Sequence, residues 1–151
     1  MNREEALQKL KSFCAYQPRC NSEAREKLQD LGLSDSEGEK ILEQLVKESY
    51  LSEERYAVHF ARGRFRIKNW GRLKIKFALF QKQVNKHSIE KGLAEIDEAL
   101  YQKTLKKLAD EKFRLLKSEK NSFVRKKKTK EYLMHKGYEP VLINKLLASM
   151  K

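Results

Sequence analysis

The chain has 151 residues, 36% of them charged, and it carries a formal net charge of +13 with a pI of about 9.7. This composition excludes a thick single core, and no apolar run is long enough for a membrane span or a signal peptide. The positive charge favours a polyanionic partner in the cytoplasm: nucleic acid, an acidic protein surface or anionic lipid. We expect the only two cysteines, Cys14 and Cys20, to be free thiols in that reducing compartment.

Residues 1–51 are predicted to form a first unit of three helices. Apolar residues at three- and four-residue spacing predict a helix over 3–16. It ends before Pro18, because the residue before a proline is pushed out of the helical region. Ser22 is the expected N-terminal cap of the second helix, which ends at Gly32, and a third helix follows.

Residues 52–96 and 97–151 are predicted to repeat this three-helix pattern. In the second unit a long helix opened by Ser52 is broken at 69–71. Its expected apolar face carries Tyr56, Phe60, Gly63 and Ile67, and that of the next helix carries Leu73, Phe77 and Phe80. We expect Phe65 to lie in the core with Phe60, Phe77 and Phe80. The remaining helices are expected over 72–82, 88–96, about 97–117, 122–136 and 140–150.

The three units share a sequence register. Six positions align without gaps at offsets of 51 and 54 residues: Leu28/Leu79/Leu133, Gly32/Gln83/Gly137, Leu33/Val84/Tyr138, Gly38/Ile89/Ile143, Leu42/Leu93/Leu147 and Leu45/Ile96/Met150. Each unit of about 50 residues has a core too small to be very stable alone, so stacking in a row is favoured. The sequence thus predicts an all-α fold of three tandem three-helix units.

Charge is distributed unevenly over these units. Residues 1–61 carry 9 Lys/Arg and 12 Asp/Glu, and residues 92–111 carry 3 and 5. By contrast, residues 62–91 carry 10 and 1, and residues 112–151 carry 12 and 3. Two blocks of net charge +9 favour basic patches that a polyanion can contact. Each block could also be a merely solvated helix face.

Catalytic and metal-binding motifs are absent from the sequence. There is no phosphate-binding glycine loop, no nucleophile motif and no His/Cys cluster. Carboxylates are scarce where the positive charge is dense, whereas two-metal nuclease sites need several of them. We therefore expect neither an enzyme nor a cofactor.

The first candidate binding surface lies in 52–76. Arg55, His59, Arg62 and Arg66 follow one another at four, three and four residues, so they share a helix face. Arginine suits phosphate and carboxylate because its planar fork donates parallel hydrogen bonds. Trp70 could stack on a base, anchor a protein interface or fill the junction between two helices. The further candidates here are Arg64, Lys68, Arg72, Lys74 and Lys76.

The second candidate surface is consecutive in sequence, so on a helix it surrounds the axis instead of forming a stripe. It is expected either to contact phosphates or to maintain solubility. Its members are Arg125, Lys126, Lys127, Lys128 and Lys130.

The chain resembles the RecX family, most specifically over 52–76. The stretch 51–64 (LSEERYAVHFARGR) has an acidic helix start, an aromatic-Ala pair, a second aromatic residue and then arginines. The stretch 68–76 (KNWGRLKIK) is similar to the basic turn and basic helix that follow in the family. The helices ending in Leu-Gly-Leu at 31–33 and Lys-Gly-Tyr at 136–138 also resemble it.

Two positions depart from the family pattern. Gln83 stands where the family usually has a glycine that ends the helix. Gly38 stands at a core position that is usually apolar.

The resemblance implies an elongated, curved row of three-helix units and a role in DNA repair, recombination and the SOS response. RecX-like proteins are non-enzymatic modulators, usually inhibitors, of the RecA recombinase, and they lie along the RecA–DNA filament. The expected partners are that filament and single- and double-stranded DNA without sequence preference, bound by a monomer. Two alternatives remain: a DNA-binding protein with no RecA partner, or attachment to an anionic membrane.

Overall fold

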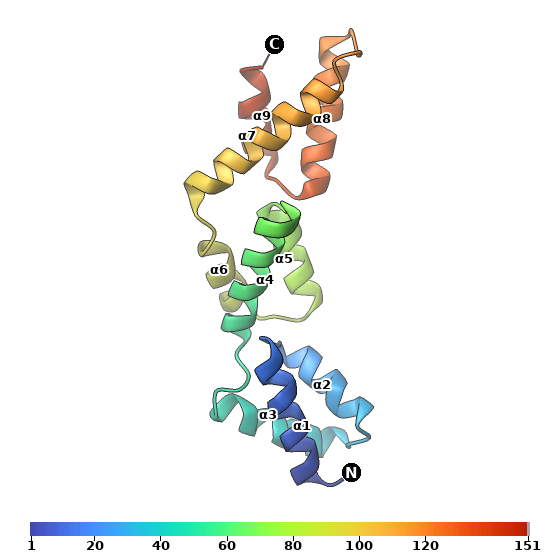
Figure 1. Ribbon diagram of the computed structural model, residues 1–151, viewed down its shortest axis with the longest axis vertical. Helices are drawn as coiled ribbons and strands as arrows, with labels where there is room; N and C mark the ends of the chain where they lie inside the picture. Colours follow the sequence, from blue (N-terminus) through green and yellow to red (C-terminus); the bar gives the residue numbers. More distant parts are fainter. Residues whose placement is uncertain (151) are drawn as a thin grey trace. The chain divides into compact units, whose positions relative to one another are not determined.

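The computed structural model describes residues 1–150 and contains only α-helices and their connections. The all-α prediction is therefore confirmed. No helix in this part of the chain is both long and apolar enough to cross a bilayer. The nine helices found in it are α1 (Arg3–Tyr16), α2 (Asn21–Asp30), α3 (Asp35–Lys47), α4 (Glu53–Lys68), α5 (Arg72–Gln81), α6 (Lys86–Ala94), α7 (Glu98–Leu115), α8 (Ser122–Lys136) and α9 (Pro140–Ala148) (Figure 1).

The chain divides into two compact units. Unit 1 comprises Met1–Phe60 and Ala78–Gly92, and unit 2 comprises Ala61–Phe77 and Leu93–Lys151. Helices α4, α5 and α6 contribute residues to each unit, because the division falls within these three helices. The domain limits expected from the sequence, after residues 51 and 96, stay predictions.

Unit 1 has its apolar core between α1, α2 and α3, which Figure 1 shows packed together. Leu10, Ile41 and Leu45 are fully buried there. Helix α2 begins two residues earlier than expected, with Cys20 as its N-terminal cap. The backbone N–H of Cys20 donates to the Glu23 carboxylate at 3.2 Å. Ser22 is not the cap: its hydroxyl donates instead to the Lys82 carbonyl at 2.7 Å.

Unit 2 has its core between α7, α8 and α9. Leu105, Leu133 and Ile143 are almost fully buried, together with the rings of Tyr101 and Tyr138. Local signals define the helix ends. Asp97 and Asn121 cap α7 and α8, Gly137 ends α8 in the left-handed conformation, and Pro140 is the first residue of α9.

The sequence repeat corresponds to a repeated helix end. The backbone N–H of Leu33, Val84 and Tyr138 donates to the carbonyl of Leu28, Leu79 and Leu133, respectively, at 3.1–3.2 Å. The residue immediately before each donor has a positive φ: +82° at Gly32, +62° at Gln83 and +101° at Gly137. Each is a Schellman-type end. Gln83 thus adopts the glycine-like conformation although it has a Cβ.

Gly38 leaves a small hole at the core position that Ile89 and Ile143 fill in the other two repeats. A cavity of about 30 Å³ lies beside it, lined also by Leu28 and Leu33. A Cβ built on Gly38 would meet only the Leu28 side chain, at 3.8 Å. The site therefore has room for at least a methyl group.

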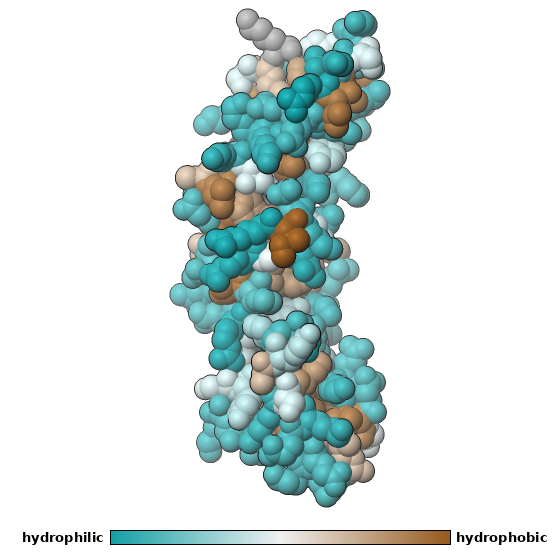
Figure 2. All heavy atoms as spheres, viewed as in Figure 1, coloured by the Kyte–Doolittle hydropathy of each residue, from teal (hydrophilic) through white to brown (hydrophobic). Residues whose placement is uncertain are grey.

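The predicted apolar faces of α4 and α5 were partly wrong. Tyr56 and Phe65 are buried and Phe60 is half-buried, but Ile67 is 81% exposed. On α5 the expected core residues Leu73, Phe77 and Phe80 are exposed, and Ile75 and Leu79 are buried instead. Helix α5 is apolar on two faces, so its periodicity alone does not determine which face packs. On the side shown in Figure 2, apolar residues form separate patches among hydrophilic ones.

Candidate nucleic-acid interface

The positive charge of the chain belongs to unit 2. That unit contains 22 Lys/Arg and 8 Asp/Glu, a net charge of +14, whereas unit 1 contains 12 and 13, a net charge of −1. Thirteen of the fourteen residues predicted as binding residues lie in unit 2. The excess of positive charge that favours a polyanion therefore lies in unit 2.

Arg55 is the one predicted binding residue in unit 1. Its guanidinium donates to the Ser49 carbonyl at 2.8 Å, and its backbone N–H donates to the Ser52 hydroxyl at 3.2 Å. Arg55 thus stabilises the connection between α3 and α4.

The connection between α4 and α5 packs directly on the connection between α8 and α9. The Gly71 N–H donates to the Lys136 carbonyl at 2.8 Å, and the Leu73 N–H donates to the Gly137 carbonyl at 2.9 Å. The two backbones are so close that a Cβ on Gly71 would overlap the Gly137 backbone. The Tyr138 hydroxyl also donates to the Asn69 carbonyl at 2.9 Å.

This glycine contact determines where the basic turn lies within unit 2, and sequence reasoning missed it. The signal that could have found it is the pair of glycines in Asn-Trp-Gly and Lys-Gly-Tyr, at 71 and 137. Glycine is the residue that permits such a close backbone approach. Nothing in the spacing of the two turns indicates that they meet.

Arg72 is occupied by groups of its own unit. Its guanidinium donates to Glu139 and to Glu98 at 2.7 Å each, and it lies 3.9 Å from the centre of the Tyr101 ring. The Arg72 N–H donates to the Tyr101 hydroxyl at 3.0 Å, and that hydroxyl donates to Glu139. Because its guanidinium is bound to two carboxylates, Arg72 stabilises the fold of unit 2 and is not an exposed binding residue.

The pKa values around Arg72 agree with this role. Burial lowers the Arg72 pKa, but the hydrogen bonds to Glu98 and Glu139 outweigh it and raise the pKa above its usual value. Burial, together with the hydrogen bond to Glu139, raises the pKa of Tyr101. The guanidinium therefore stays charged and the phenol stays protonated at any physiological pH.

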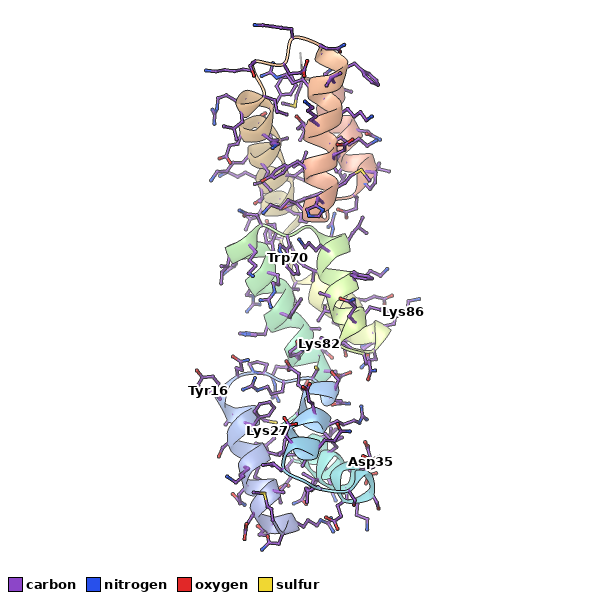
Figure 3. The ribbon with its side chains drawn as sticks, turned by 90° about the vertical axis from the view of Figure 1, so that its right-hand side faces the viewer. Tyr16, Lys27, Asp35, Trp70, Lys82 and Lys86 are labelled. Atoms are coloured by element: carbon purple, nitrogen blue, oxygen red, sulfur yellow. The ribbon has the colours of Figure 1, made fainter. Side chains whose placement is uncertain are left out.

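Trp70 is surrounded by cations. Its ring centre lies 4.7 Å from Lys74 Nζ, 5.5 Å from Arg64 Cζ and 6.0 Å from Lys68 Nζ. The indole is half-buried in the connection between α4 and α5, where Figure 3 labels it. We call Arg64, Lys68, Trp70 and Lys74 the Trp70 cluster. The negative face of an aromatic ring attracts cations, so the indole helps to hold three positive charges together.

Three further predicted cations in this part of unit 2 are exposed: Arg62, Arg66 and Lys76. Arg62 has Glu95 at 3.9 Å, but both side chains are more than half exposed, so that ion pair is weak. These three residues and the Trp70 cluster form what we call the basic surface of unit 2.

The second predicted patch is divided in the same way. The Arg125 guanidinium donates to the Phe113 carbonyl and lies 3.6 Å from the centre of the Phe113 ring, so it connects α8 to α7. Lys128 lies 3.5 Å from Glu119. Lys126, Lys127 and Lys130 take part in no ion pair among the described residues. These three cations and the half-exposed Lys128 can contact a ligand.

The exposed cations of unit 2 can bind anions. Within residues 1–150 no three His, Cys, Asp or Glu side chains come together to hold a metal ion. Cys14 and Cys20 are buried, and burial raises the pKa of both thiols, which disfavours the reactive thiolate.

Comparison with known proteins identifies the family of the chain. Residues 52–93 match the family model of the RecX second three-helix domain, and residues 99–147 match that of the third. A regulatory protein RecX of Prosthecochloris aestuarii is 30% identical over 145 residues, which cover 95% of this chain and 91% of the relative. One from Clostridium perfringens (strain 13 / Type A) is 32% identical over 118 residues, or 78% of this chain, and the match spans only 55% of that relative.

Solved structures show the same fold. A crystal structure of RecX from Lactobacillus salivarius superposes with a TM-score of 0.87 at 20% identity, covering 98% of this chain and 96% of the other. A crystal structure of a regulatory protein RecX also gives a TM-score of 0.87, at 22% identity, covering 97% of this chain and 72% of the other. On the sequence matches and the shared fold, the chain belongs to the RecX family.

Proposed function

We propose that the chain regulates the RecA recombinase by binding the RecA–DNA filament through the basic surface of unit 2. The names of its relatives support a regulatory role. The confinement of the net positive charge to unit 2 supports a polyanionic target. A filament of protein on DNA presents such a target over a long distance.

The observation that carries this proposal is the Trp70 cluster. Three cations lie within 6.0 Å of one indole ring, on a turn that backbone hydrogen bonds attach to the connection between α8 and α9. Like charges held together on a supported turn bind phosphates or carboxylates without a further entropic cost of ordering. We propose that the bound protein acts as an inhibitor, because a ligand lying on the filament restrains the movements that ATP hydrolysis needs.

The test is RecA ATPase activity on single-stranded DNA, with and without this protein, at two salt concentrations. The informative variant replaces four exposed cations of unit 2 with glutamate: Arg62, Arg66, Lys68 and Lys76. Arg72 is left intact, because its removal would disturb the fold. A matched control makes the same change at four exposed cations of unit 1: Arg3, Lys40, Lys47 and Lys91.

We expect the wild-type protein and the unit 1 control to lower the ATPase rate and the unit 2 variant to leave it unchanged. Inhibition retained by the unit 2 variant, or abolished equally in the control, would overturn the proposal. A wild-type protein that binds DNA but does not change the ATPase rate would instead favour the alternative function, DNA binding without a RecA partner. That binding would weaken steeply with salt, as counterion release requires.

A further inference from the structure

Unit 1 contains a basic, aromatic groove although its net charge is slightly negative. The groove lies between α1 and α2 and has a volume of about 590 Å³, within the range of small-ligand clefts. Two aromatic residues, Phe13 and Tyr16, and three cations, Lys9, Arg19 and Lys27, line it, and its other lining residues are uncharged. Thirteen carboxylates belong to this unit, and none of them lines the groove.

Arg19 is held in place by Phe13. Its guanidinium carbon lies 3.8 Å from the centre of the Phe13 ring, and its Nε donates to the Phe13 carbonyl at 3.0 Å. Lys27 Nζ approaches the same ring to 5.7 Å. One partly buried hydrogen bond and two cation–π contacts thus fix positive charge at the wall of the groove.

These cations are uncompensated. No ion pair in the described part of the chain involves Lys9, Arg19 or Lys27. Elsewhere in unit 1, Arg25 lies 2.7 Å from Glu39, and Lys11 lies 3.7 Å from Glu48. The groove therefore gathers three cations whose positive charge is available to a ligand.

Tyr16 gives the groove an exposed ring. It is the last residue of α1, it is 83% exposed, and Arg19 Cζ lies 5.9 Å from its centre. Figure 3 shows Tyr16 at the end of its helix and Lys27 on the neighbouring α2. An exposed flat ring beside unpaired cations combines the two groups that bind single-stranded nucleic acid, a stacking platform and phosphate contacts.

We propose that this groove binds one nucleotide unit of a single-stranded nucleic acid, with a base stacked on Tyr16 and the phosphates near Lys9, Arg19 and Lys27. An acidic peptide would use the cations but would leave the Tyr16 ring in water. The inference does not rest on the proposed function, because the groove shares no residue with the basic surface of unit 2.

The first test is photocrosslinking of the full chain to an octamer of deoxythymidine that carries one 5-iododeoxyuridine, followed by mass spectrometric mapping. We expect a crosslink at Tyr16 that Tyr16→Phe retains and Tyr16→Ala abolishes. Crosslinks confined to unit 2 would overturn the groove and leave the proposed function standing. Thermal unfolding of the Tyr16 variants, which alter an exposed ring, provides the check that the fold is intact.

The second test is fluorescence anisotropy with a labelled deoxythymidine octamer, in the unit 2 variant in which Arg62, Arg66, Lys68 and Lys76 are already replaced with glutamate. Removing the ring with Tyr16→Ala should lower the affinity about tenfold. Reversing Lys9 and Lys27 to glutamate should lower it further, whereas reversing Lys40 and Lys47 should not change it. Unchanged binding in Tyr16→Ala, or displacement of the octamer by polyglutamate but not by unlabelled octamer, would overturn the proposal.

Discussion

The two units of this chain use charged side chains in different ways. Unit 1 is nearly neutral, with 12 cations and 13 carboxylates, and its core between α1, α2 and α3 is apolar. Unit 2 carries a net charge of +14 and places a polar cluster, Arg72 with Tyr101 and Glu139, beside its core. The same repeated three-helix pattern therefore supports either a surface whose positive and negative charges nearly cancel or a strongly basic one.

Positive charge in unit 2 is itself of two kinds. Arg72 and Arg125 donate to groups of the unit itself, so they stabilise the fold. Arg66 and Lys76 are exposed, so they are available to a ligand. Substitutions of the two kinds should have separable effects on stability and on binding.

The largest effect should come from charge reversal in unit 2. Replacing Arg62, Arg66, Lys68 and Lys76 with glutamate should weaken binding to single-stranded DNA at least about 100-fold at low salt, because four attractions to phosphate become repulsions. The slope of log K against log salt should become shallower by about 0.7 for each phosphate that the variant no longer neutralises. Fluorescence anisotropy over a salt series measures both quantities.

The matched reversal in unit 1, at Arg3, Lys40, Lys47 and Lys91, is expected to change the salt slope little. Equal salt slopes for the two variants would show that DNA responds only to the net charge of the whole protein. The distinction between the two units would then be wrong.

The next effect concerns the glycine contact within unit 2. Gly71→Ala should destabilise unit 2 by about 3 kcal/mol, because the new Cβ would overlap the backbone of Gly137. Gly63→Ala is the control: nothing lies within 4 Å of its Cβ, and alanine in a helix should stabilise by about 0.5–1 kcal/mol.

Urea unfolding followed by tryptophan fluorescence measures this, because the single tryptophan, Trp70, lies in unit 2. A Gly71→Ala protein as stable as the wild type would contradict the close approach of the two turns.

A smaller effect is expected at Arg72. Arg72→Met should cost about 2–3 kcal/mol, because it leaves the partly buried Glu139 without its cation. Arg66→Met, at an exposed position, should stay within about 0.5 kcal/mol of the wild type. In the same urea experiment, equal midpoints for the two variants would mean that the Arg72 contacts add nothing to stability.

The smallest effects should be stabilising and should come from the two departures from the family pattern. Gln83→Gly should add about 1 kcal/mol, because it relieves a positive φ of +62° at a residue that has a Cβ. Gly38→Ala should add about 1 kcal/mol, since the cavity accepts the methyl group and alanine favours the helix.

Both residues lie in unit 1, so circular dichroism is the suitable measurement, and tryptophan fluorescence should change less. A lower stability of Gln83→Gly would indicate that the glutamine side chain makes a compensating contact.

Local signals allowed much of the fold to be predicted, whereas the site could be predicted only in part. Helix α1, the Gly32 and Gly137 helix ends and helix α8 agree with expectation, because caps and helix ends are determined by neighbours along the chain. The prediction for the apolar face of α5 was wrong, because Ile75 and Phe77 lie on different faces of this helix and both faces are apolar. Among the predicted binding residues, no local feature separates the internal Arg72 from the exposed Arg66.

The sequence by itself determined the all-helical class, the repeated helix end, the family and the location of positive charge along the chain. The family follows from a resemblance to known sequences, and the other three features depend on interactions between residues close in sequence or on simple composition. Only the tertiary structure decided which cations remain available, how the Gly71 turn meets Gly137, and that Phe13, Tyr16 and Lys27 line one groove. Those features depend on partners that come from other helices, and the pattern along a single helix contains no information about which partner it meets.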